Sequence, residues 1–495
     1  MSMRDKWQPK PGDRVLRPRR GKHSRLRRVL GIPSLFSAGF GDVGSSIYYA
    51  LGVVALVALG ATPVALVIAG IIFIFNSLTY AEGGAMVPEA GGSATFARYG
   101  FNDLGGFVSG WALILSYIAT IAISAYTIPP YLSYFWPALK DPIIGTTFSM
   151  GVIVILILVN IIGIKESTRL NLLFIVFVIA TQLVLVIIGF ALILVPNPQD
   201  LIQHMFGAGN WPSTASLIFG ISIASLCFTG VETIAQLAEE TRHPEKKIPR
   251  AYMLLIVAVF TLFTGISVVA LAAMTPQVLG DPVNGWARDP VAGVAANLPY
   301  PFLSTIFAPL VAIAASGILF GATNAGVLGS SRLVFNLATQ RQFPAVLSGI
   351  NHRFRTPHVA IVSFSGLAII LLIPGFFFAR FFADLGALYV FGSLLSFAIA
   401  HASILSLRWR QPDLPRPFRL RWNISFKGRE LPITTILGFL ATTTIWFTII
   451  VTEPISSGLA GGIWMIGGFI IYYLYRRRAG LPLTQTPTIE THTEV

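Results

Sequence analysis

Two acidic residues stand inside strongly apolar segments of the sequence, where a carboxylate is costly. Asp42 lies in "GFGDVGSSIYY" and Glu232 in "CFTGVETIAQ", each beside glycine and hydroxyl residues. An ionisable group in such a segment usually faces a cavity and marks an ion or substrate path. We expect both residues to serve in ion or proton coupling, either as a cation ligand or as a proton carrier. A structural hydrogen-bonding role is the alternative for each.

Each carboxylate stands beside small residues that disfavour a continuous helix. Residues 44–46, Gly-Ser-Ser, have low helix propensity, so unwinding there costs little and leaves backbone amides available to an anion. The N-terminal end of the following half-helix adds partial positive charge at the same place. Close packing of two helices is the alternative use of such residues. Thr229 and Gly230 repeat the pattern beside the second carboxylate, which predicts two matching breaks.

A third apolar segment carries hydroxyl groups at helical spacing. Tyr117, Thr120 and Ser124 are three and four residues apart and therefore share one face of a helix. They are candidate contacts for a substrate or a cation, although Ser and Thr are also common packing residues in membrane helices. Tyr389, in "LGALYVFGSLLSF", is a further candidate contact.

No pattern of an enzyme is visible. The sequence has no Ser/His/Asp arrangement in a suitable context, no HExxH, no phosphate-binding loop with its lysine and no dinucleotide fingerprint. Its single cysteine, Cys227, excludes an intrachain disulfide, and no His/Cys cluster has zinc spacing. We therefore expect no catalytic residues, metal or cofactor, and transport driven by a gradient rather than by ATP.

Composition places these residues in an integral membrane protein. Hydrophobic residues make up 54% of the chain and charged residues only 11%. Apolar runs of about 20 residues, the length that crosses a bilayer as a helix, predict twelve spans. They lie near residues 33–60, 63–86, 105–133, 146–164, 171–195, 213–237, 251–274, 303–332, 358–378, 385–408, 433–452 and 459–476.

The placement of positive charge predicts the orientation. The net charge is +14, and eleven of the 35 basic residues precede the first span, in a tail at 1–30. The basic region of this tail is too long for a signal peptide. Its charge indicates a cytoplasmic anchor or a contact with lipid headgroups rather than a nucleic-acid site. The remaining basic residues fall in alternate loops, which places both termini in the cytoplasm of a multi-pass plasma-membrane protein. The expected partners are a small molecule or ion and membrane lipid, and the protein is either a monomer or a homodimer.

The two breaks are five spans apart, which suggests an inverted repeat of the kind found in secondary transporters. The predicted architecture is therefore all-α, with a first five-helix repeat at 31–195 and a second at 212–408. Helices 11 and 12 follow at 429–477, and a cytoplasmic tail occupies 478–495.

The chain resembles the amino acid, polyamine and organocation superfamily over nearly its whole length. "VGSSIYY" is similar to the glycine-serine motif of its broken first helix, "PEAGGSATFARYGF" to the turn after the second, "IKESTRLN" to the loop before the fifth, and "FTGVETIAQLAEETRHPEKKIPRA" to its sixth-helix signature. The resemblance implies the LeuT-type 5+5 fold with twelve helices, of which helices 1 and 6 are broken.

The resemblance also implies where a substrate binds. Backbone amides at the first break would hold a substrate carboxylate, and carbonyls at both breaks would hold its amino group. These positions are Val43, Gly44, Ser45, Ser46 and Ile47 at the first break and Cys227, Phe228, Thr229 and Gly230 at the sixth. The lysine that some proton-coupled members carry in the fifth helix is absent from residues 171–194.

A second resemblance points to an inorganic substrate. The aspartate in "GDVGSSIYY" is similar to one in Kup and KimA-type potassium importers, and the KimA potassium site would fall on Asp42, Tyr49, Tyr117, Thr120, Ser124, Thr229 and Tyr389, with Glu232 as a second acidic group. One acidic position of that family falls on Ser116 and does not match. The leading expectation is uptake of amino acids or related amines, coupled to H⁺ or by exchange, with K⁺ or Na⁺ as other coupling ions. Potassium/proton symport is the alternative among carriers. The competing functions outside the carrier class are a channel, a membrane-embedded enzyme and a receptor.

Overall fold

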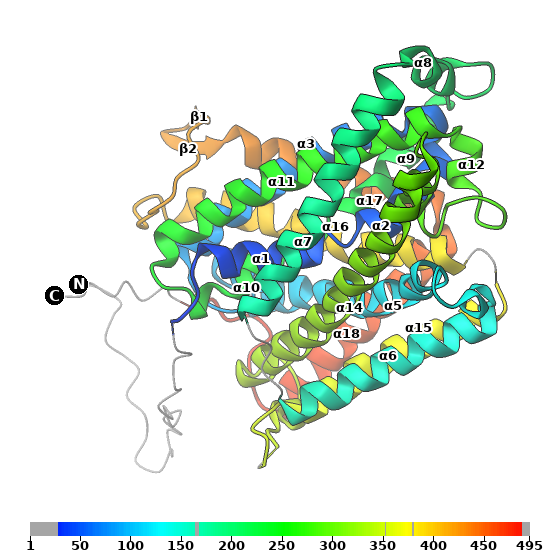
Figure 1. Ribbon diagram of the computed structural model, residues 1–495. Helices are drawn as coiled ribbons and strands as arrows, with labels where there is room; N and C mark the ends of the chain where they lie inside the picture. The colour runs from blue at the N-terminus through cyan, green and yellow to red at the C-terminus, as the bar shows by residue number, and fades with distance from the viewer. Residues whose placement is uncertain (1–27, 164–167, 352, 379–380, 488–495) are drawn as a thin grey trace, which may run out of the picture.

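The computed structural model describes residues 28–163, 168–351, 353–378 and 381–487 (Figure 1). Within these residues the chain is helical apart from turns, loops and one short hairpin, which confirms the all-α prediction. Most of the predicted tail at 1–30, residues 164–167 of "IKESTRLN" and the last part of the tail at 478–495 lie outside the described residues.

The described residues contain eleven helical stretches that are long and apolar enough to cross a membrane. The first, Ile32–Met86, has 55 residues, although a single crossing needs about 20. It contains the first two predicted spans, which meet at Leu59, where φ is +46°. The other ten stretches correspond to the other ten predicted spans. The sequence predicted twelve spans, and the described residues contain eleven separate helical stretches, so the count of twelve is not confirmed.

The first half of the chain forms seven helices, and the polar residues between them mark where they begin and end. Asn102 caps one helix by accepting from Gly105 N at 3.0 Å, and Asp141 caps the next through Ile143 N at 2.9 Å. The helices are α1 (Ile32–Val43), α2 (Ile47–Ala58), α3 (Thr62–Met86), α4 (Ser93–Gly100), α5 (Asp103–Leu132), α6 (Pro142–Ile162) and α7 (Thr168–Gly189), with short 3₁₀ helices η1 (Leu59–Ala61) and η2 (Pro137–Lys140) and a π-helical segment η3 (Phe190–Leu194) that continues α7.

Proline opens most helices of the second half, because its missing N–H has no intrahelical partner at that position. The helices are α8 (Pro198–Phe206), α9 (Thr214–Ala224), α10 (Glu232–Gln236), α11 (Pro244–Ala273), α12 (Pro276–Gly280), α13 (Pro290–Ala296), α14 (Pro301–Thr339), α15 (His358–Leu372) and α16 (Phe381–Arg410). The short turns among them are η4 (Ser225–Phe228), η5 (Ala238–Glu240), η6 (Ala345–Ser348) and η7 (Ile373–Phe376).

The last part of the described chain begins with an antiparallel hairpin of β1 (Asn423–Phe426) and β2 (Arg429–Pro432). Two membrane helices follow it, α17 (Ile433–Thr452) and α18 (Ala460–Arg478), joined by η8 (Pro454–Leu459).

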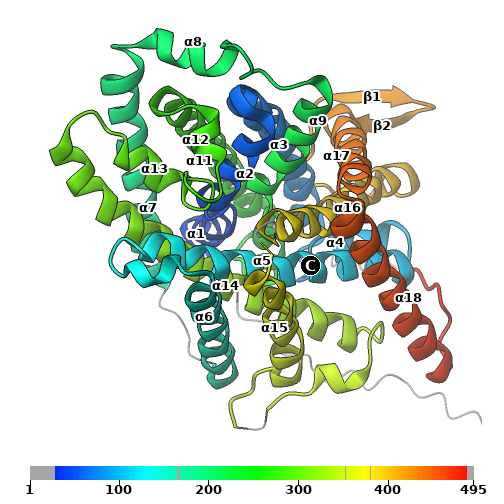
Figure 2. The same ribbon diagram turned by 90° about the vertical axis from the view of Figure 1, so that its right-hand side faces the viewer.

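Helix α5 is the centre of the bundle. Its most apolar stretch is 94% buried inside the protein, compared with 22% for the last span. It packs along α14 and α16, while α17 and α18 lie at the edge of the molecule (Figure 2). Helix α1 packs against α11, α7, α10 and α14, so the first break lies beside the sixth-span segment at the centre of the fold.

Candidate functional site

The break in the first span is a tight turn rather than an extended segment. Helix α1 ends at Val43 and α2 begins at Ile47, but Gly44 and Ser46 keep helical dihedral angles. The backbone tightens there, because Ser46 N donates to Val43 O at 3.1 Å, three residues back. The predicted break is present, but it is narrower than the pattern of small residues suggested.

The break in the sixth span is wider. The turn η4 ends at Phe228, Thr229 is extended with φ −81° and ψ 160°, and Gly230 has φ +95°. A new short helix, α10, begins at Glu232. The Thr229 hydroxyl donates to Leu226 O at 2.9 Å and so satisfies one carbonyl at the end of the turn. The backbone here therefore departs from a helix at the position that the sequence indicated.

Asp42 connects the two breaks. Its side chain is 3% exposed, and Oδ2 accepts a hydrogen bond of 2.5 Å from the Thr233 hydroxyl on α10. A methyl group on Gly230 would place its carbon 2.7 Å from Asp42 Cγ, so only glycine allows the carboxylate to approach this closely. The Ser45 hydroxyl donates to the Asp42 carbonyl at 2.7 Å and fixes the backbone of the first break.

Glu232 lies at the start of α10 with its side chain 1% exposed. Its Oε2 atom has no hydrogen-bond partner among the described residues. Burial of an unpaired carboxyl oxygen costs free energy, so this atom is a natural point of contact for a proton or a ligand.

The predicted hydroxyl face of the third span lies on α5 and is buried. The Tyr117 hydroxyl accepts from Gln236 Nε2, which ties α5 to α10. The Thr120 hydroxyl instead donates to the Ser116 carbonyl at 2.9 Å, and Ser124 Oγ has no partner among the described residues. Ser116, the position that departs from the potassium-importer pattern, pairs its hydroxyl with that of Ser393 at 2.7 Å.

The two remaining candidate tyrosines lie near the first break. Tyr49 pairs its hydroxyl with that of Ser46 at 2.9 Å, and its ring stands edge-on to Phe382. Tyr389 lies on α16 and is 1% exposed.

A cavity of about 180 Å³ reaches toward this cluster between α1, α5, α7, α10 and α14. Thr233 and Gln236 line it, and these are the residues that hold Asp42 and Tyr117. Arg332 also lines it and pairs with Glu240 at 3.3 Å. The cavity therefore ends one side chain away from Asp42.

Most of the predicted substrate contacts lie behind the wall of this cavity. Of the predicted site residues, Tyr117 alone lines it. Val43 and Ile47 are buried, and Phe228 packs its ring against Phe73 and Phe263 with centroids 5.3 and 5.5 Å apart. Cys227 is also buried. The structure thus brings Asp42, Gly230 and the first break together but does not open the backbone of either break to this cavity.

Two residues of this arrangement, Thr233 and Gln236, were not among the sequence candidates. A signal for them exists, because Glu232, Thr233 and Gln236 are spaced by one, three and four residues and so lie toward one side of a helix.

The comparisons with known proteins decide the family. A family model described as amino acid permease matches residues 30–473. The chain belongs to this amino acid permease family. Membership confirms the resemblance to the amino acid, polyamine and organocation superfamily, and the helical structure with its membrane stretches is consistent with the LeuT-type fold of these permeases.

Curated relatives of this permease cover nearly all of the chain. The branched-chain amino acid permease BcaP of Bacillus subtilis is 26% identical over 482 residues, which are 92% of this chain and 94% of the relative. The methylthioribose transporter of Bacillus subtilis is 25% identical over 494 residues, and the alignment covers 93% of this chain and 96% of the relative. The Asc-type amino acid transporter 1 of Mus musculus is 26% identical over 415 residues, and the alignment covers 82% of this chain and 73% of the relative.

These findings establish a multi-pass membrane transporter with a small-molecule substrate. The family and its named relatives are transporters and not enzymes. The resemblance to potassium importers is not supported by these comparisons.

Proposed function

We propose that this permease is a secondary active transporter that imports amino acids or related amines across the plasma membrane, with both termini in the cytoplasm. The full-length relatives support the substrate class, since two of the three named above transport amino acids by their names. Proton coupling or exchange is the expected mode, and K⁺ or Na⁺ are the other coupling ions to test.

The observation that carries the proposal is the contact of Asp42 with Gly230 and Thr233 across the two breaks. A substrate carboxylate would bind the amides at residues 43–47, where the N-terminal end of α2 adds partial positive charge. Its amino group would bind the carbonyls at 227–230. Asp42 and Glu232 would then sense the substrate or carry the coupled proton, because both are buried beside the same backbone.

The position of the cavity supports a state that opens toward the cytoplasm. Arg332 and Leu237, which line it, belong to loops and helix ends that the positive-inside rule assigns to the cytoplasm. On the opposite side, the loop before α13 presses on α2, since a methyl group at Gly52 would lie 2.2 Å from Ala287 O. Release of substrate into the cavity would require Thr233 and Gln236 to leave Asp42 and Tyr117.

A ligand panel on the purified protein tests this proposal. Thermal unfolding is followed in potassium-free buffer with potassium, rubidium, sodium and each amino acid added in turn. A ligand at about 100 times its Kd stabilises the native state by roughly 2.7 kcal/mol, which raises the unfolding temperature measurably. We expect a shift with one group of amino acids and its loss in Gly230→Ala.

The same panel distinguishes the alternative substrate. A shift with potassium and rubidium, abolished by Asp42→Asn and absent for every amino acid, would replace amino-acid transport with potassium/proton symport. Uptake of the stabilising compound into proteoliposomes, with and without a proton gradient, then separates symport from exchange.

A further inference from the structure

The linker between α16 and α17 folds into the β1–β2 hairpin at the surface of the protein. Its strands pair Asn423 with Pro432 and Phe426 with Arg429. Lys427 and Gly428 form the two-residue turn with φ of +49° and +73°, which suits the twist of a tight hairpin. The hairpin is therefore a folded element of defined register rather than an irregular loop.

One face of this hairpin is apolar and exposed. Alternate residues of a strand point to the same side, so Trp422, Ile424 and Phe426 share a face with Leu431 of the opposite strand, and Arg429, opposite Phe426, stands at the turn end of this face. The first three are exposed to 72%, 49% and 53%. The Phe426 ring also lies 6.1 Å from that of Trp409, which is itself exposed. Ser425 and Glu430 occupy the other face.

Basic residues surround this apolar face. Arg419, Arg421, Lys427 and Arg429 stand in or beside the hairpin, and Glu430 is the single acidic residue of the segment 419–430. Glu430 pairs with Arg419, which leaves an excess of positive charge on Arg421, Lys427 and Arg429. Aromatic and basic residues on one element are typical of a site that lies in the headgroup region of a membrane.

The helices on both sides fix the depth of the hairpin. Helix α16 ends at Arg410 and α17 begins at Ile433, and both are candidate membrane spans. Figures 1 and 2 place the hairpin at the outer edge of the bundle, beside α17. A segment between two adjacent span ends lies at the membrane surface.

Hydrogen bonds hold the linker in this position. Leu420 N donates to Glu82 Oε2 at 3.1 Å, and Ile433 N donates to Trp422 O at 2.8 Å. Arg416 adds bonds to the carbonyls of Gln411 and Leu414, each 2.8 Å long. The apolar face is thus presented in a preformed geometry.

We propose that the β1–β2 hairpin is a binding site for anionic phospholipid. Trp422, Ile424 and Phe426 insert into the headgroup and upper acyl region, while Arg421, Lys427 and Arg429 contact lipid phosphates. This inference does not depend on the transported substrate, because it concerns a surface outside the transport path.

Site-directed labelling of the full-length protein in nanodiscs tests the proposal. Ile424→Cys and Ser425→Cys are each labelled with an environment-sensitive fluorophore, and they are matched controls because they lie on opposite faces of one strand. The native Cys227 is buried and does not compete for the label. Quenching by lipids with a nitroxide near the headgroup is measured in phosphatidylcholine, with and without phosphatidylglycerol. We expect strong quenching of the fluorophore on Ile424→Cys and little quenching of the one on Ser425→Cys. Phosphatidylglycerol should increase the difference in quenching between the two variants.

A charge variant tests the anionic preference. Arg421→Gln, Lys427→Gln and Arg429→Gln together should remove the increase caused by phosphatidylglycerol. High salt should do the same in the unsubstituted protein, which covers the case of a variant that does not fold. Equal quenching at 424 and 425 would overturn the proposal, and so would quenching at 424 that neither phosphatidylglycerol nor salt changes.

Discussion

At the scale of single residues, Asp42 and Glu232 have different surroundings and therefore different expected roles. Asp42 accepts a hydrogen bond from Thr233 and fits against Gly230, whereas Glu232 has one oxygen without a partner among the described residues. A carboxyl group that lacks a fixed partner can exchange a proton with little rearrangement of its neighbours. We therefore propose that Glu232 carries the coupled proton and that Asp42 aligns the two breaks.

Glu232→Gln should separate exchange from accumulation. The amide keeps the shape of the side chain but cannot release a proton, so substrate exchange in proteoliposomes should persist while uptake against a gradient is lost. Glu239→Gln, seven residues later in η5, is the matched control and should accumulate substrate normally. Accumulation by Glu232→Gln at the level of the unsubstituted protein would remove Glu232 from the coupling step.

Gly230→Ala should abolish transport through a defined clash. The substitution adds backbone strain at φ +95°, expected to cost more than about 1 kcal/mol, and it drives a methyl group into the Asp42 carboxylate. Gly209→Ala is the control, because Gly209 has φ +80° but open space around its added carbon. Transport assays and unfolding temperatures of both variants measure the two effects. If both variants keep full transport, the close approach of Asp42 is not required.

The sequence predicted part of this site. Asp42 and Glu232 were recognisable because a carboxylate in an apolar segment is costly and needs a reason. Thr233 and Gln236 were not chosen, because hydroxyl and amide residues carry no such cost and their partners lie 191 and 119 residues away. Asp42 contacts Gly230 because α1 packs against α10. Such packing between distant segments is not encoded in a local sequence pattern.

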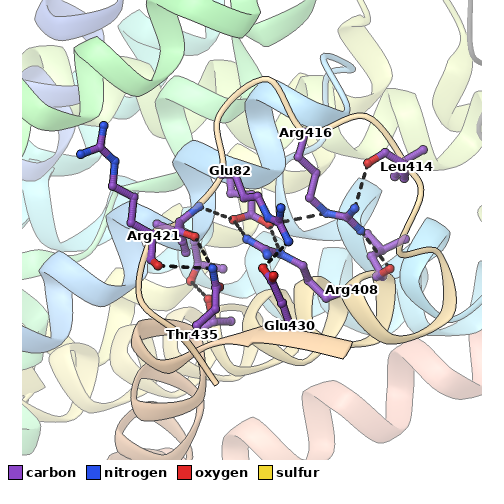
Figure 3. A network of polar contacts seen from close by, with 12 residues as sticks. Glu82, Arg408, Leu414, Arg416, Arg421, Glu430 and Thr435 are labelled. Carbon is purple, nitrogen blue, oxygen red and sulfur yellow. Dashed lines mark hydrogen bonds and ion pairs between the residues drawn. The ribbon is translucent and has the colours of Figure 1, made fainter. Parts of the chain in front are cut away.

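At the scale of elements, a buried ion pair holds helices from the two predicted repeats together. Glu82 on α3 is fully buried and receives two hydrogen bonds from Arg408 on α16, 2.7 and 2.6 Å long (Figure 3). Arg416 approaches the same carboxylate at 3.9 Å. We propose that this cluster keeps the linker 411–422 docked against both helices during transport.

Glu82→Gln should destabilise the protein strongly, because it leaves the Arg408 charge buried without its counter-ion. Loss of one partner of a buried pair typically costs about 3–5 kcal/mol. Glu430→Gln removes the carboxylate of the exposed Arg419 pair and should cost less than about 1 kcal/mol. Unfolding temperatures in one detergent compare the two variants. Similar small losses in both would show that Arg408 finds another partner.

The sequence predicted which elements break and did not predict how. Low helix propensity at residues 44–46 and at Gly230 located both breaks correctly. The first nevertheless stays a compact turn, because Ser46 N still finds the Val43 carbonyl and Ser45 Oγ the Asp42 carbonyl. Of the residues at the two breaks, Gly230 alone adopts a positive φ, so the break in the sixth span opens further than the break in the first. The hairpin at 423–432 was not predicted, since its two strands are only four residues long.

At the scale of the whole molecule, the arrangement of helices predicts which side of the membrane reaches the cavity. Hydropathy predicted the first two spans separately, at 33–60 and 63–86, whereas the structure joins them into one helical stretch of 55 residues, because η1 (Leu59–Ala61) links α2 directly to α3. The repeats at 31–195 and 212–408 remain a proposal. Their expected relative movement would open the cavity on one side and close it on the other.

Cysteine accessibility tests this movement and the orientation together. Gly321 lines the cavity with open space around an added side chain, and Gly366 on α15 has the same open space outside it. In Gly321→Cys, a membrane-impermeant thiol reagent should react from the cytoplasmic side, where water lets the thiol ionise, and transported substrate should slow the reaction. Gly366→Cys, inside a membrane span and away from the cavity, should not react with the impermeant reagent with or without substrate. The buried Cys227 keeps the background low. Reaction of Gly321→Cys from the outside alone would reverse the orientation inferred from the charged loops.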